Sequence, residues 1–97
     1  MPLYISLMRW TSQGIGGLPA WRERLEDAER DIEEAGGKLV DVWVTLGRFD
    51  VVEVFEAPDD ETAALVLLTL QRRGGVETET LRAFSREEAE NIIRRLK

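Results

Sequence analysis

The sequence predicts an α+β fold in which two helices cover one face of a four-stranded antiparallel sheet. Four segments show the apolar alternation that is typical of β-strands. Two segments between them carry apolar side chains at helical spacing on otherwise charged or mixed stretches. The predicted elements follow one another in the order βαββαβ, and one further helix ends the chain.

The first predicted strand covers residues 3–10, where apolar side chains recur at every second position. A glycine-rich loop follows at residues 11–18, with a glycine spacing that does not fit a phosphate-binding motif. The first helix is predicted at residues 19–35, because Pro19 suits a first helical turn and Gly36 suits a helix end. Its single apolar stripe consists of Trp21, Leu25, Ala28, Ile32 and Ala35.

Two further strands are predicted at residues 38–46 and 49–57. The short link between them, Gly47-Arg48, predicts a tight turn and therefore an antiparallel hairpin. Pro58 ends the second of these strands, because proline cannot donate a hydrogen bond to a neighbouring strand.

The second half of the chain repeats the alternation of helix and strand. A helix is predicted at residues 59–73, where an acidic start complements the helix dipole, and a strand at residues 76–84. Ser85 and Glu88 form a capping box that opens a last helix at residues 86–96. Because crossovers between parallel strands are right-handed, this order predicts the ferredoxin-like arrangement with an added C-terminal helix.

Composition limits the chemistry that this chain can perform. Its 97 residues predict a single domain spanning residues 1–97, and they include no cysteine and no histidine. Thiolate or imidazole catalysis and Cys- or His-ligated metals are therefore excluded, and we expect no cofactor and no metal. The net charge of −6 disfavours nucleic acid and anionic membranes as partners. No signal peptide or long apolar run is present, so we expect a cytoplasmic protein.

The face of the sheet that the helices leave open is the predicted functional surface. We expect a second subunit to cover it, because its apolar patch is large for a monomer, which predicts a homodimer or a higher homo-oligomer. The helices are expected to cover Leu3, Ile5, Leu7, Val40, Val42, Val44, Val52, Val54, Leu81 and Ala83. The open face is expected to carry Tyr4, Ser6, Met8, Trp10, Asp41, Trp43, Thr45, Val51, Glu53, Phe55, Thr78, Thr80 and Arg82.

Two interpretations of the polar groups on that face remain open. In one, Glu53 pairs with Arg82 and the face is only an interface. In the other, aromatic walls and a few polar groups form a small-ligand cavity. The candidate ligand-binding residues are then Trp10, Trp43, Thr45, Thr80 and Arg82. The candidate general bases are Glu53 and Asp50, because burial would raise the pKa of such a carboxyl group toward neutrality.

Four short strings together resemble the GYD domain family over about residues 3–90. They are Gly47-Arg48-Phe49-Asp50, Trp10-Thr11-x-x-Gly14, Glu56-Ala57-Pro58-Asp59-Asp60 and Thr80-Leu81-Arg82-Ala83-Phe84. Phe49 stands where the family usually has a tyrosine. The resemblance implies a ferredoxin-like domain of the dimeric α/β-barrel type and assigns no reaction.

A more distant resemblance concerns the effector-binding module of leucine-responsive and asparagine-type regulators. It is carried by Thr45-x-Gly47-x-Phe49-Asp50-x-Val52 and Gly75-Val76-x-Thr78-x-Thr80. It implies sheet-to-sheet dimers that bind small ligands between subunits, here without a helix-turn-helix. Two hypotheses follow: a non-enzymatic, homo-oligomeric small-ligand-binding or structural module, or a small cofactor-independent oxygenase or isomerase that uses a cavity on the sheet face.

Overall fold

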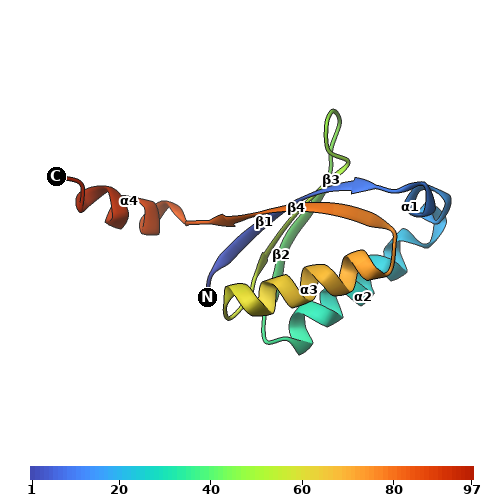
Figure 1. The fold of residues 1–97 in the computed structure, drawn as a ribbon, viewed down its shortest axis with the longest axis horizontal. Helices are drawn as coiled ribbons and strands as arrows, with labels where there is room; N and C mark the ends of the chain where they lie inside the picture. Colours follow the sequence, from blue (N-terminus) through green and yellow to red (C-terminus); the bar gives the residue numbers. More distant parts are fainter.

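A computed structural model describes all residues, 1–97, and shows an elongated molecule of 51 × 31 × 18 Å. It contains four strands and four α-helices (Figure 1), and one short 3-10 helix, η1, precedes the second α-helix. The elements are β1 (Leu3–Trp10), α1 (Ser12–Gly16), η1 (Leu18–Ala20), α2 (Trp21–Glu34), β2 (Lys38–Val44), β3 (Val51–Glu56), α3 (Asp60–Arg72), β4 (Val76–Ala83) and α4 (Arg86–Arg94).

The four strands form one sheet in the order β2-β3-β1-β4, and all neighbouring strands are antiparallel. Helices α2 and α3 lie side by side on the same face of the sheet, α2 over β2 and α3 over β4 (Figure 1). This is the predicted ferredoxin-like topology, so the predicted fold class is confirmed. A bulge at Val40 shifts the pairing of β2 with β3.

Helix ends follow the local chemistry of the sequence. The Asp59 carboxylate accepts a hydrogen bond from the backbone N–H of Thr62 at 2.8 Å and caps α3. Ser85 and Glu88 form the predicted capping box of α4, with reciprocal bonds of 2.9 and 3.1 Å. Gly74, after α3, has a φ of 87°, a conformation that other residues rarely adopt.

The hydrophobic core lies between the sheet and the two long helices. Phe55 is completely buried there, and its ring stacks on Tyr4 with the centroids 5.3 Å apart. Ile32 of α2 and Val66 of α3 close over these rings. The core is therefore built from the even positions of β1 and the odd positions of β3.

This arrangement inverts the predicted assignment of the two sheet faces. The helices cover the side of β1, β3 and β4 that was expected to be open, and the side expected to be covered is open. The physical reason is that both faces of β1 and β3 carry apolar side chains, so alternation separates two sets without identifying the helix-covered one. The residues found opposite to the prediction on these strands include Tyr4, Ser6, Met8, Val51, Glu53 and Phe55 on the covered side and Leu3, Ile5, Leu7, Val52, Val54 and Leu81 on the open side.

Two loops also differ from the predicted ones. Strands β2 and β3 are joined by six residues, 45–50, rather than by a tight turn at Gly47-Arg48. The loop closes at its base, where the backbone N–H of Thr45 donates to the carbonyl oxygen of Asp50 at 2.8 Å. The predicted glycine-rich loop contains helix α1, which Thr11 caps by accepting from the N–H of Gly14.

Helix α4 extends beyond the sheet from the end of β4 and does not pack on α2 or α3 (Figure 1). Its apolar residues Ile92, Ile93 and the following Leu96 are exposed. No helix of this structure has both the length and the apolar character that a membrane span requires.

Candidate functional site

A cavity of about 280 Å³ lies between the covered face of the sheet and the helical layer. Its apolar walls come from β1, β2, β3, β4, α2 and α3, and its polar groups are few. Such a cavity, with mostly apolar walls and a few polar groups, is typical of small-molecule sites. Its lining includes Trp10, Trp21, Arg24, Glu53, Arg73 and Gly75.

Glu53 marks the inner end of this cavity. On β3 it lies between Phe55, which belongs to the core, and Val51, which also lines the cavity. Only 4% of its surface is exposed, and no hydrogen bond or ion pair holds its carboxylate. Burial without a partner raises the pKa of Glu53 to about 7. This side chain is therefore a buried carboxyl group that titrates near neutrality and faces a cavity.

At the other end of the cavity, the segment that begins α1 packs against the turn between α3 and β4. The hydroxyl of Thr11 donates to the carbonyl oxygen of Gly74 at 2.6 Å. The backbone N–H of Thr11 donates to the carbonyl oxygen of Gly75 at 3.1 Å. A Cβ atom on Gly14 would collide with the carbonyl oxygen of Gly75. Glycine at position 14 thus allows α1 to lie directly against the turn between α3 and β4.

The guanidinium of Arg24 lies at this same end. Cβ atoms on Gly17 or Gly75 would occupy the space that its terminal nitrogens fill. Glycine at both positions therefore leaves room for a cation beside the cavity. Arg24 makes no ion pair, whereas the other two charged groups at this cavity besides Glu53, Asp27 and Arg73, each have one.

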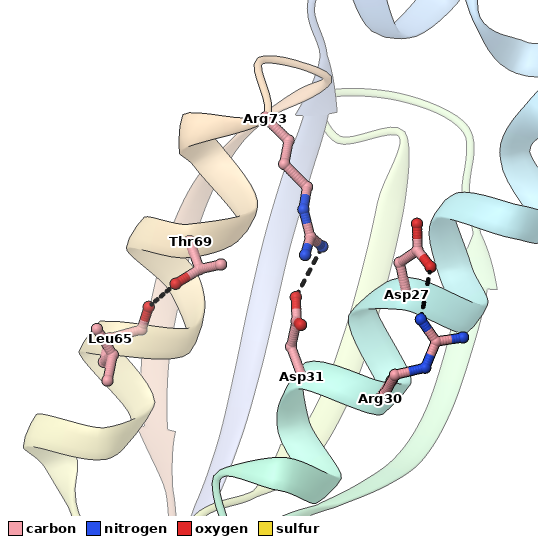
Figure 2. A network of polar contacts seen from close by, with 6 residues as sticks. All are labelled: Asp27, Arg30, Asp31, Leu65, Thr69 and Arg73. Carbon is pink, nitrogen blue, oxygen red and sulfur yellow. Dashed lines mark hydrogen bonds and ion pairs between the residues drawn. The ribbon is translucent and has the colours of Figure 1, made fainter.

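One of these ion pairs ties the end of α3 to α2, and the other lies within α2. Figure 2 shows Arg73, at the end of α3, reaching Asp31 of α2, with Nη1 and Oδ2 2.7 Å apart. One turn earlier on α2, Asp27 pairs with Arg30 at 3.2 Å (Figure 2). Among the charged residues that line the cavity, Arg24 and Glu53 are thus left without an ionic partner.

The predicted site residues are not all brought together. Trp10 and Glu53 line the cavity, which lies on the covered face. Trp43 is on the opposite face and 49% exposed. The hydroxyl of Thr45 donates to the carbonyl oxygen of Phe49 at 2.8 Å, inside the loop between β2 and β3.

The remaining candidates make structural contacts. Thr80 and Ser6 share a hydrogen bond of 3.1 Å between their hydroxyls. Arg82 stacks on Phe84, 4.5 Å from the ring centroid, and donates to the carbonyl oxygen of Ala83. The predicted Glu53–Arg82 ion pair is absent, because Arg82 extends toward the end of β4.

Asp50 also has a structural partner, because its carboxylate accepts from the backbone N–H of Trp10 at 2.9 Å. Two guanidinium groups contact the ring of Phe49, that of Arg9 at 5.1 Å and that of Arg48 at 5.5 Å from the ring centroid. The loop that carries these residues is therefore held by contacts within the hairpin and with β1.

Sequence reasoning missed the helical half of the cavity. Trp21 was placed on the apolar stripe of a helix, and Arg24 was not among the candidate residues. The available signal was the group of glycines at positions 14, 17 and 75, since three such residues near strand ends indicate close approaches of the backbone.

The open face of the sheet carries a continuous apolar surface. Cross-strand neighbours on it run from Trp43 through Val52 to Leu7, and from Val54 through Ile5 to Leu81. Trp43 and Leu81 are about half exposed, at 49% and 48%. We call this surface the open-face stripe; it consists of Leu3, Ile5, Leu7, Trp43, Val52, Val54 and Leu81.

Comparison with known proteins identifies relatives of this chain. It is 36% identical, over the full length of both proteins, to the glutamine synthetase and cystathionine beta-lyase binding protein of Thermus thermophilus. The crystal structure of TTHA0845 from the same species is similar, with a TM-score of 0.56 and 26% identity over 87% of this chain and 94% of that one. Residues 4–93 match the GYD domain. The chain therefore belongs to the GYD domain family.

Proposed function

We propose that this chain is a homo-oligomeric binding protein that docks on an enzyme of amino-acid metabolism and carries a small-ligand site of its own. The observation that carries the proposal is the 36% identity, over both full lengths, to a protein named for binding glutamine synthetase and cystathionine beta-lyase. Relatives that align over their whole length at this identity share a fold and, in many cases, the surfaces that the fold presents.

The functional groups of the chain favour binding over catalysis. The sequence offers no thiol and no imidazole, which are the side chains most often used as nucleophile and general base. Asp50 is engaged by the N–H of Trp10. The cavity contains one carboxyl group and one guanidinium without partners, Glu53 and Arg24, and its other walls are mainly apolar.

The open-face stripe supports self-association. An apolar surface of this kind on a small domain is usually covered by another molecule. Helix α4 presents further unpartnered apolar residues, Ile92 and Ile93, on a segment that extends past the sheet (Figure 1). In a dimer packed sheet to sheet, the projecting α4 of one subunit would lie against the partner, so both apolar surfaces would be buried by one symmetric contact.

Light scattering of the purified chain tests the oligomer. We expect a mass of at least twice 11.1 kDa at micromolar concentration. Leu81→Glu, which places a charge in the open-face stripe, should reduce this mass to that of a monomer. Leu65→Glu is the matched control, because Leu65 is an exposed leucine of α3 in the helical layer, and it should leave the mass unchanged. A wild-type monomer would contradict the proposed oligomer.

Biolayer interferometry tests the enzyme partner. The chain is immobilised and exposed in turn to glutamine synthetase, to cystathionine beta-lyase and to an unrelated enzyme, each purified from the organism that encodes the chain. We expect saturable binding to at least one of the first two and none to the third. Absence of binding to both would contradict the proposed partner class.

One observation favours a second function. Glu53 is a buried carboxyl group with a pKa of about 7 beside a cavity, which suits a general base in a small cofactor-independent oxygenase or isomerase. The cavity of this alternative lies on the covered face, not on the open face. If the chain turns over a small substrate, Glu53→Gln should abolish the turnover while the fold is retained.

A further inference from the structure

We propose that the cavity binds a small aromatic or branched aliphatic acid that also carries a hydrogen-bond donor, with the donor at Glu53 and the acid group at Arg24. This inference deepens the small-ligand part of the proposed function by naming the ligand class. It does not depend on the enzyme partner, because every residue that carries it lines the cavity within one subunit.

The two ends of the cavity carry opposite charges. Glu53 is in the middle of β3, paired with Ser6 on β1 and with Val42 on β2. Arg24 is placed next to Gly17 and Gly75, at the end where β1 leads into α1 and α3 leads into β4. The two groups lie at different register positions of the sheet, because Glu53 pairs with Ser6 whereas Val76, the residue after Gly75, pairs with Trp10, four residues further along β1. A ligand that satisfies both groups must therefore be extended.

Glu53 requires a donor. A buried carboxylate without a hydrogen bond costs several kcal/mol in an order-of-magnitude estimate, and a ligand N–H or O–H would offset part of that cost. No side-chain oxygen of this protein is both fully buried and without a hydrogen-bond partner. Because the Glu53 carboxylate has no such partner, its oxygens remain accessible from the cavity. The protein has thus placed an acceptor where only a ligand or water can reach it.

Arg24 is available to an anion, because it has no ion-pair partner. The other guanidinium that lines the cavity, Arg73, is neutralised by Asp31, and the carboxylate of Asp27 is neutralised by Arg30. The forked guanidinium of Arg24 is therefore free for a ligand carboxylate, which it suits in geometry. Arg24 is exposed as a whole residue, and glycine at positions 17 and 75 leaves the space beside the cavity that its terminal nitrogens fill.

The apolar walls between Glu53 and Arg24 favour a ligand whose central part is apolar. Trp10 and Trp21 supply aromatic surface, and Leu25, Val42 and Val76 supply aliphatic surface. The volume of about 280 Å³ suits a molecule with one or two rings rather than a nucleotide. An aromatic or branched aliphatic body fits these walls.

Three probes separate the contributions of the two charged ends. Indole-3-acetate has a ring N–H and a carboxylate, naphthalene-1-acetate has a similar shape without the N–H, and indole lacks the carboxylate. Calorimetry at pH 8, where Glu53 is mainly ionised, should give about tenfold tighter binding for indole-3-acetate than for naphthalene-1-acetate, as one hydrogen bond to a charged group predicts. Equal affinities for these two acids would overturn the assignment of Glu53.

Variants assign each end to its residue. Glu53→Leu removes the acceptor at similar volume, so the preference for indole-3-acetate should disappear. Arg24→Gln should weaken both acids by about tenfold and leave indole unchanged. Gly17→Ala should act in the same direction, because its Cβ displaces the flexible end of Arg24. Arg22→Gln, two residues earlier on α2 and outside this cavity, is the matched control and should change nothing. Equal binding of the acids by wild type and Arg24→Gln would overturn the assignment of Arg24.

The three tryptophans provide a readout that needs no variant. Trp10 and Trp21 line the cavity, and Trp43 lies on the other face of the sheet. In ¹H–¹⁵N spectra, indole-3-acetate should shift the side-chain signals of Trp10 and Trp21 and leave that of Trp43 in place. A shift of Trp43 alone, or no shift at millimolar probe, would overturn the cavity as the binding site. Because these measurements use the chain by itself, they can fail while enzyme binding succeeds, or the reverse.

Discussion

The backbone N–H of Trp10 donates to the carboxylate of Asp50 at 2.9 Å. This contact joins the last residue of β1 to the loop between β2 and β3, 40 residues away in the chain. The N–H of Asp50 in turn donates to the carbonyl oxygen of Met8 at 2.8 Å. The two bonds fix the end of β1, and with it Trp10, which lines the cavity.

Replacing Asp50 with alanine should loosen this junction. The N–H of Trp10 is partly buried, so the loss of its acceptor should lower the free energy of unfolding by about 1–2 kcal/mol. Urea unfolding followed by circular dichroism measures the change. Asp41→Ala is a suitable control, because the Asp41 carboxylate bonds only to the N–H of the next residue on an exposed strand, and its effect should stay within about 0.5 kcal/mol. Equal effects of the two substitutions would contradict the role given to Asp50.

Glu53 should make the protein more stable at acidic pH than at alkaline pH. Its pKa in the folded state is about 7, above the ordinary value of 4.5, so the folded state binds the proton more tightly than the unfolded state. This contribution is fully present below pH 4.5 and is lost as the pH rises through 7, a total of about 3 kcal/mol. Glu53→Gln should remove this pH dependence and stabilise the protein at pH 8.

Chemical denaturation at pH 5.5 and pH 8 compares wild type with Glu53→Gln. The other charged groups that line the cavity, Arg24, Asp27 and Arg73, are unchanged in both proteins. The difference between the two proteins therefore isolates Glu53. A stability difference that is the same at both pH values would show that Glu53 does not titrate in this range.

Gly14→Ala should be strongly destabilising. The added Cβ would meet the backbone carbonyl oxygen of Gly75, which cannot move without displacing the turn between α3 and β4. We expect a loss of about 2–4 kcal/mol, as for other overpacked sites. Gly16→Ala is the matched control within the same short helix, since nothing lies within 4 Å of its added Cβ. The midpoint of thermal unfolding should be lower for Gly14→Ala than for the wild type, and the midpoint for Gly16→Ala should not be lower than that of the wild type.

Tyr4 is the one tyrosine of the chain, so its ionisation can be followed directly. Burial, together with its hydrogen bond to Asp60 at 2.6 Å, raises the pKa of Tyr4 to about 12. Stability from this residue is present below pH 10 and is lost as the pH rises through 12. Absorbance of the tyrosinate near 295 nm, an ordinary wavelength for that ion, should rise only above pH 11. A midpoint near the ordinary value of 10 would contradict the buried hydrogen bond.

Local sequence patterns predicted the elements that form the fold. Alternation in residues 3–10 and the capping box of Ser85 and Glu88 depend on neighbours in the chain, and both correspond to what the structure shows. The loop between β2 and β3 was predicted too short, because Gly47 suggested a two-residue turn while Thr45 and Asp50 close a longer one. Turn length depends on which backbone groups pair across the loop, and a single glycine does not specify that pairing.

The candidate site was predictable in part. Glu53 and Trp10 were selected as candidates because a carboxyl group and an indole stood among apolar strand residues. Arg24 was not, since a charged residue on a charged helix has no local feature that separates it from Arg22 or Arg30. Its position beside the cavity depends on Gly17 and Gly75, which lie far apart in the chain and meet only in the folded molecule.

The sequence by itself determined the order of strands and helices, the fold class and the absence of thiol and imidazole groups. Each of these depends on residue identity or on spacing within one element. Only the tertiary structure decided which face of the sheet the helices cover. Leu7 and Met8 are both apolar, so alternation could not separate them, and packing of α2 and α3 against Met8 and its neighbours made the choice. That choice placed Glu53 at a cavity beneath the helices and left Trp43 on the open face.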